Sequence, residues 1–255
     1  WMLVQRNLKI RYKNSVLGFF WTLLGPVFLI LIYWVFIRLL KIEITVNALV
    51  SGIIVWQFVA TTLGDSLNAI LGNANLVTKT AFPRFLLPLS TVCANFINYL
   101  LTLVVLLVFL VTLKANFGML YLLPLILITQ FALCLGLSLL VSSLNVFFRD
   151  VEHLMGVVLL AWFFLSPVMY RNDYVVARLE GMPQLTESAG RFFHGCFPAN
   201  PMAGIVTAFR NVLLQEPEDF IPGVFFLVPL ILSWAILCLG FFVFGKLEKQ
   251  FGDEL

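Results

Sequence analysis

The sequence predicts an all-α membrane protein with six transmembrane helices. Hydrophobic residues make up 61% of the 255 residues, charged residues only 11%, and the mean hydropathy is +1.01. Soluble domains carry roughly 25% charged residues, so a chain this apolar belongs in a bilayer. The hydrophobic residues form long charge-free segments, and a helix needs about 20 such residues to cross.

The first 16 residues carry four cations and no acid, with apolar residues between them. On a helix, Leu8 and Tyr12 fall near Val4, whereas the cations point elsewhere. Two interpretations stay open: an amphipathic interface helix in the cytoplasmic headgroup layer, or an ordinary positively charged flank of the first span. The cations are Arg6, Lys9, Arg11 and Lys13.

Six segments qualify as spans. The fourth is longer than one perpendicular crossing needs, but two helices and a turn would require about 40 residues, so we expect one tilted or interrupted helix. Asp65 is the only acid well inside a span, near enough to its end to be interfacial. The expected spans are 17–40, 49–71, 85–113, 117–148, 154–170 and 221–245.

The connections set the orientation. The loop 72–84, the cluster at Arg149, both termini and the tail 246–255 fall on one side and together hold nine Lys and Arg. The short loops of the other side hold three, and the long region 171–221 is poor evidence because long loops translocate regardless of charge. Both termini are therefore predicted to be cytoplasmic.

Region 171–221 contains one helical pattern. Asn200 can cap a helix, and Pro201 suits its first position. The pattern continues to Gln215, which is too short to cross, so the segment is predicted to be re-entrant or interfacial.

Catalytic motifs are absent from the sequence. Gly240 to Lys246 matches the start of a P-loop, but Leu247 stands where Ser or Thr would bind magnesium, and the stretch lies inside a predicted span. The four cysteines are scattered without CxxC spacing. The chain is therefore expected to be no enzyme and to hold no metal or cofactor of its own.

Aromatic side chains gather in spans one, two and five. One interpretation is packing against lipid and neighbouring helices. The other is a ring-lined path, because flat rings stack on sugars without holding a moving polymer tightly. Charged walls would suit ions better, and the spans offer almost none. The residues expected along such a path are Tyr33, Trp34, Trp162, Phe163 and Tyr170.

Several motifs in order resemble one family. They are Arg6-Asn-Leu-Lys-Ile-Arg-Tyr12, Asn75-Leu-Val-x-Lys79 with Phe82-Pro83-Arg84, Asn145-Val-x-x-Arg149-Asp150, Ser166-Pro167-x-x-Tyr170, Asn200-Pro201 and Phe209-Arg210. Together they resemble the permease subunits of bacterial type-2 ABC exporters of lipid-linked polysaccharide, which serve O-antigen, capsule and teichoic acid export.

The resemblance implies a homodimer in the bacterial inner membrane, bound to two copies of a cytoplasmic ABC ATPase that holds the ATP and magnesium. It implies re-entrant gate helices in 171–221, and a basic N-terminal helix (Arg6, Lys9, Arg11, Lys13) that attracts the lipid diphosphate of the glycan. No nucleic acid is expected. The residues implied in coupling to the ATPase are Asn75, Leu76, Val77, Lys79, Phe82, Pro83, Arg84, Arg149 and Asp150.

Three alternatives remain. A related permease could export a small molecule or a lipid. An ion-coupled secondary transporter would need buried acids and an inverted repeat, and the spans offer only Asp65. A membrane glycosyltransferase would need a carboxylate cluster at a pore mouth, for which Asp150 and Glu152 are the only cytoplasmic candidates.

Overall fold

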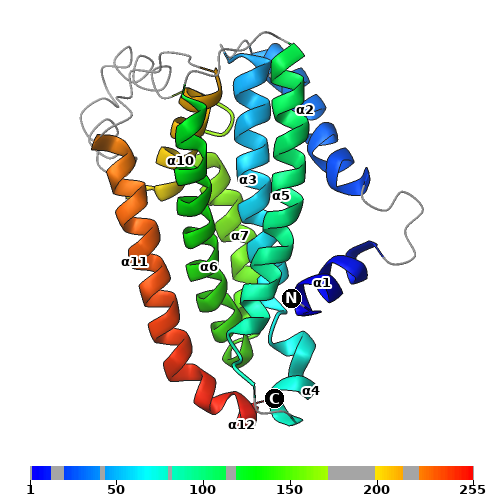
Figure 1. The fold of residues 1–255 in the computed structure, drawn as a ribbon, viewed down its shortest axis with the longest axis vertical. Coiled ribbons are helices and arrows are strands. Elements are labelled where there is room, and N and C mark those ends of the chain that lie inside the picture. The colour runs from blue at the N-terminus through cyan, green and yellow to red at the C-terminus, as the bar shows by residue number, and fades with distance from the viewer. Residues whose placement is uncertain are drawn as a thin grey trace.

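The computed structural model is a bundle of long, roughly aligned helices (Figure 1). It describes residues 2–12, 20–40, 44–79, 82–112, 119–171, 199–214 and 224–254, and every regular element within these ranges is helical. The all-α prediction is confirmed at that level. The α-helices are α1 (Met2–Tyr12), α2 (Phe20–Leu40), α3 (Val46–Leu67), α4 (Ala74–Lys79), α5 (Leu86–Thr112), α6 (Leu123–Phe147), α7 (Asp150–Leu165), α10 (Pro201–Leu214), α11 (Val224–Leu247) and α12 (Phe251–Glu254).

Four helical segments in the described part are long and apolar enough to cross a bilayer: Val46–Leu67, Leu86–Val108, Leu120–Phe147 and Phe226–Gln250. The third includes the 3₁₀ turn η2 (Leu120–Leu122) and runs without a break, as expected for a single fourth span. Two other expected spans correspond to α2, of 21 residues, and α7, of 16.

Helix α7 stops short of the expected end at residue 170 because of Pro167. The residue before a proline avoids the helical region. Ser166 accordingly adopts extended backbone angles, φ −102° and ψ 144°, and closes α7 at Leu165. At about 1.5 Å per residue, α7 is roughly 24 Å long, less than the hydrocarbon thickness.

Two helices begin where side chains cap them. Thr45 Oγ1 accepts a hydrogen bond from Ala48 N at 3.2 Å and starts α3. Asn200 Oδ1 accepts one from Met202 N at 3.0 Å, with Pro201 in the first helical position. This confirms the capped helix predicted at that point.

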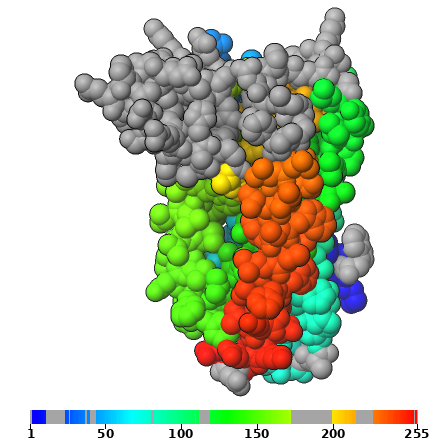
Figure 2. Space-filling model, turned by 90° about the vertical axis from the view of Figure 1, so that its left-hand side faces the viewer, coloured from blue at the N-terminus to red at the C-terminus, as the bar shows by residue number. Residues whose placement is uncertain are grey.

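Close packing of α6 on α11 depends on glycine. A Cβ at Gly240 would lie 2.4 Å from the Gly136 carbonyl oxygen, and one at Gly136 would lie 2.7 Å from the backbone of Ile236. The two glycines therefore let α6 and α11 approach closely, and Gly240, the first glycine of the P-loop-like string, is a packing residue inside α11. Figure 2 shows α11 running down the outside of the bundle.

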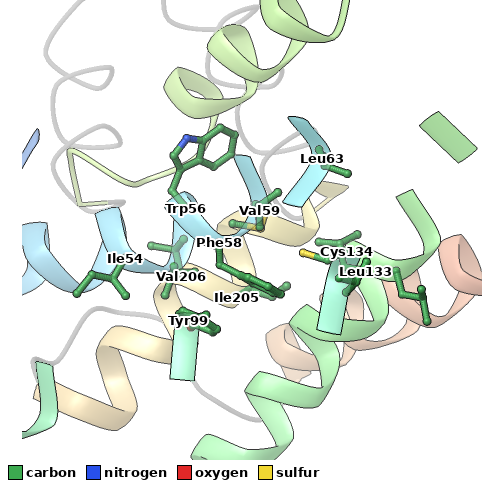
Figure 3. Close-up of a cluster of buried hydrophobic side chains, with 14 of the residues drawn as sticks. Ile54, Trp56, Phe58, Val59, Leu63, Tyr99, Leu133, Cys134, Ile205 and Val206 are labelled. Atoms are coloured by element: carbon green, nitrogen blue, oxygen red, sulfur yellow. The ribbon is translucent and has the colours of Figure 1, made fainter. Parts of the chain in front are cut away.

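The core lies around α3, which packs against α5, α6, α7 and α10. Phe58 of α3 stacks on Tyr99 of α5, with ring centroids 4.8 Å apart (Figure 3). Polar side chains also join the helices, as transmembrane bundles commonly show. Gln130 Nε2 donates to the Val55 carbonyl at 2.8 Å and Gln130 Oε1 accepts from the Tyr99 hydroxyl at 3.0 Å.

The C-terminus lies at one end of the bundle, together with α4 and α12, and the N-terminus lies in the same half of the molecule, where α1 packs beside α5 (Figure 1). The 3₁₀ turn η1 (Leu71–Asn73) leads from α3 towards α4, and η3 (Glu248–Gln250) leads from α11 into α12. Of the region expected to hold gate helices, α10 is described, whereas 172–198 and 215–223 lie outside the described residues.

Candidate transport and coupling sites

Helix α4 has one exposed side and one buried side. Asn75 and Lys79 of α4 are exposed, whereas Val77 is buried and packs into the core. Leu76 is half-buried. Because α12 contacts α4, the buried side of this short helix rests on the C-terminal segment. The polar side of α4 faces solvent, as a docking surface for a soluble partner requires.

The loop after α4 is held by the same C-terminal segment. Arg84 Nη1 donates a hydrogen bond to the Glu248 carbonyl oxygen of η3. Phe82 is half-buried against the core and Pro83 is exposed. Arg149 and Asp150, at the turn from α6 to α7, are both exposed.

Four aromatic rings from three helices meet at the junction of α2, α3 and α7. Trp56 of α3 lies between Phe163 and Trp162 of α7, with centroid distances of 5.5 and 5.8 Å, and Tyr33 of α2 stacks on Phe163 at 5.6 Å. We call Tyr33, Trp56, Trp162 and Phe163 the aromatic cluster. Phe163 and Trp56 are only 6% and 8% exposed, so these two rings support the half-buried Tyr33 and Trp162 by packing.

The other two residues expected along the path lie elsewhere. Trp34 is 41% exposed, and its ring lies 5.7 Å from the guanidinium carbon of Arg38, on the outer side of α2. Tyr170 lies beyond α7, where its hydroxyl donates to the Phe164 carbonyl at 3.1 Å. Trp56 belongs to the cluster instead. The sequence indicated this only by placing Trp56 in span two, one of the three spans rich in aromatic residues.

Asn200 joins the aromatic cluster to α10. Its Oδ1 accepts from the Trp162 indole Nε1–H at 2.8 Å while it caps the helix. Its Nδ2 donates to Ser166 Oγ at 3.0 Å and to the Leu165 carbonyl at 3.2 Å. One amide thus fixes the orientation of Trp162, the end of α7 and the start of α10.

Arg210 of α10 is fully buried and binds three backbone carbonyls. Nε donates to Ala48 at 3.0 Å, Nη2 to Val168 at 2.8 Å and Nη1 to Tyr170 at 3.0 Å. Gly52 leaves the necessary room, since a Cβ there would lie 2.8 Å from Nη2. Arg210 therefore fastens α10 to the start of α3 and to the segment after α7. The sequence marked Arg210 only as part of a motif.

The basic residues of α1 differ in their surroundings. Arg6 is half-buried, and its Nη2 donates to Asn73 Oδ1 of η1 at 2.7 Å. Asn7 Nδ2 donates to Ser90 Oγ of α5 at 3.2 Å, so α1 lies against the bundle. Lys9 is exposed and can meet an anion. The side chain of Arg11 and the whole of Lys13 lie outside the described part.

Comparison with known families decides the class. Residues 1–178 match the model of a family described as ABC-2 type transporter. The chain belongs to this family. It is thus a multi-pass membrane component of an ABC-2 type transporter, and that component is not itself the catalytic part.

Similar ABC-2 proteins extend the match over the whole chain. Two proteins of Klebsiella pneumoniae, each named O-antigen export system permease protein RfbA, are 26% and 27% identical to all of this chain and are themselves covered over 93% of their length. A Myxococcus xanthus protein of the same name is 29% identical over 99% of this chain and 94% of its own.

Proposed function

We propose that this protein is the permease subunit that exports a lipid-linked polysaccharide of the O-antigen type from the cytoplasmic to the outer side of a bacterial inner membrane. Its similarity to permeases named for O-antigen export, over essentially the full length of both chains, carries the proposal. The aromatic cluster supports it, because stacked rings suit a path for sugars.

In the proposed assembly two copies form the channel, each bound to one cytoplasmic ABC ATPase subunit that supplies ATP and magnesium. Each copy crosses the membrane six times, through α2, α3, α5, α6, α7 and α11. The end bearing α4 and α12 faces the cytoplasm, and both termini lie on that side. Lys79 and Arg84 support this orientation, since cytoplasmic loops carry an excess of cations.

Helix α4 is the proposed contact with the ATPase. Asn75 and Lys79 are exposed, whereas Val77 is buried in the core. A push by the ATPase on the exposed face of α4 would therefore be passed to the core. Arg149 and Asp150 form the second part of the proposed contact, and region 171–221 with α10 forms the outer gate.

The test uses the permease and its ATPase reconstituted in vesicles with lipid-linked glycan. Lys79→Glu should leave ATP hydrolysis measurable but lower the glycan exported per ATP by about tenfold, the effect of roughly 1.4 kcal/mol in coupling. Lys249→Glu is the matched control, since Lys249 is also exposed at this end, in η3.

Three results would count against the proposal. Equal export by the Lys79 variant and the wild type would remove α4 from the coupling contact. Export of a small molecule or lipid without any glycan would favour the alternative cargo. Uphill glycan export without the ATPase would refute the two-component mechanism.

A further inference from the structure

The exposed faces of most long helices in the described part are apolar and match lipid tails. On α5 this face contains Val104, Val105 and Val108, and the other long helices carry comparable sets. The corresponding exposed residues include Val27, Phe28 and Leu31 of α2, Leu154, Val157 and Leu160 of α7, and Leu227, Ile231 and Phe242 of α11.

Helix α3 differs in its second half. Gln57, Thr61, Gly64 and Asn68 follow each other at intervals of four, three and four residues, which places them on one face. Gln57 and Thr61 are half-buried, and Gly64 and Asn68 are exposed. We call these four residues the α3 polar stripe. Asp65 lies beside it, with Oδ2 accepting from Asn95 Nδ2 at 2.9 Å.

The stripe begins at mid-membrane depth. Gln57 lies near the middle of the 22-residue α3, so it is about 15 Å from either end at 1.5 Å per residue. Its Nε2 donates to Thr61 Oγ1 at 3.1 Å, and nothing lies within 4 Å of where a Gly64 Cβ would be. A polar face at this depth would be costly in contact with lipid, so water, a polar ligand or another protein surface is expected to cover it.

The stripe continues the aromatic cluster towards the α4 end. Trp56 belongs to the cluster, and Gln57 is the next residue of the helix. In the first half of α3, which is the half farther from α4, the same face is covered, since Val50 and Ile53 are buried. Figure 1 shows α2 slanting away from α3 towards its own N-terminal end. In the half of α3 nearer α4, Gly64 and Asn68 of this face are exposed.

We propose that the α3 polar stripe is the inner wall of the translocation path and contacts the passing glycan. This inference rests on the proposed function. Amide and hydroxyl groups match the hydroxyl groups of a sugar chain, and neutral hydrogen bonds contribute only about 0.5–1.5 kcal/mol net, so the polymer is held without stalling. The half-buried rings of Tyr33 and Trp162 would bind the sugar faces on one side of Gln57, and the stripe would bind hydroxyl groups on the α4 side.

The glycan fits this face better than a second copy of the chain does. A two-fold interface places a residue near the axis against its own image. With the stripe at such an interface, Asp65 of one copy would approach Asp65 of the other, and two close carboxylates disfavour each other's ionised state. A solvated path imposes no such cost.

Two measurements on the reconstituted complex test the inference. In a background in which all four cysteines are replaced, Gly64→Cys should react with a membrane-impermeant maleimide, whereas Val108→Cys on the lipid-facing side of α5 should not. A photo-crosslinking residue at position 64 should capture radiolabelled glycan during export, and the same residue at position 108 should not.

Transport provides the third readout. Gln57→Leu with Thr61→Val keeps side-chain size but removes the amide and the hydroxyl, and should slow glycan export about fivefold, which corresponds to about 1 kcal/mol. The control pair Val104→Leu and Val108→Leu should leave export unchanged.

The outcomes separate the two proposals. If the unmodified complex exports glycan but position 64 stays unlabelled, or crosslinks only to the second copy, the inference is wrong and the proposed function stands. If the unmodified complex exports no glycan, the proposed function fails and the glycan contact fails with it.

Discussion

The contact between α6 and α11 yields the most direct test of the fold. Replacing Gly240 with Ala places a methyl group 2.4 Å from the Gly136 carbonyl oxygen and 3.0 Å from its Cα. Both atoms belong to the backbone, so the two helices must separate. Overpacking of this kind costs about 1–3 kcal/mol. Alanine regains up to about 1 kcal/mol of helix propensity, which leaves a net destabilisation of up to about 2 kcal/mol relative to wild type.

Gly245→Ala is the matched control. It lies in the same helix, five residues on, and nothing is within 4 Å of its added methyl group. It should keep or raise stability. For a chain of this size, 1 kcal/mol moves the melting temperature by roughly 2–4 °C. Both variants gain the same helix propensity, so the overpacking cost should make Gly240→Ala melt roughly 2–12 °C below Gly245→Ala.

The assay heats purified protein in detergent and follows tryptophan fluorescence together with the monodisperse fraction. Equal melting temperatures for the two variants would refute the packing role of Gly240. A third variant tests the P-loop match. Lys246→Ala should not change nucleotide binding by the complex, because Lys246 lies on α11 with its Nζ 4.3 Å from the Phe242 ring centroid.

Two further predictions concern the arginines. Arg210→Lys should lose about 3 kcal/mol, since a single ammonium cannot serve three separated carbonyls and each unsatisfied carbonyl costs about 1 kcal/mol or more. The melting temperature should fall by roughly 6–12 °C, while Arg38→Lys, at an exposed site, changes little; an unchanged Arg210→Lys protein would contradict the anchoring role. Arg6→Gln and Asn73→Leu should lower glycan exported per ATP to the same extent if Arg6 acts through Asn73, whereas a diphosphate-binding role for Arg6 predicts that only Arg6→Gln impairs export.

Local sequence patterns predicted the helices and some of the residues at which they begin. Asn200-Pro201 predicted the start of α10, because helix capping depends on neighbours in sequence. The start of α3 three residues before the expected 49 is also local: Thr45 caps it.

The links between distant segments had no such signal. Arg210 bonds to Ala48, 162 residues earlier, and Arg6 bonds to Asn73, 67 residues later. Guanidinium groups on a basic α1 suggest a lipid phosphate when the sequence is read alone. Only the folded arrangement shows that one of them is already hydrogen-bonded to the turn before α4.

Helix α3 connects the two ends of the molecule. Its first turn is held by Arg210, which also holds α10, and its centre supports the aromatic cluster through Trp56. Its last residue, Leu67, accepts from Asn145 Nδ2 at 3.0 Å, and η1 then leads directly into α4. A hydrogen-bonded helix transmits displacement along its axis because each turn is bonded to the next. If α4 receives the push of the ATPase as proposed, that push would shift α3, the aromatic cluster and α10 together, so that the proposed glycan path and outer gate would move in one step.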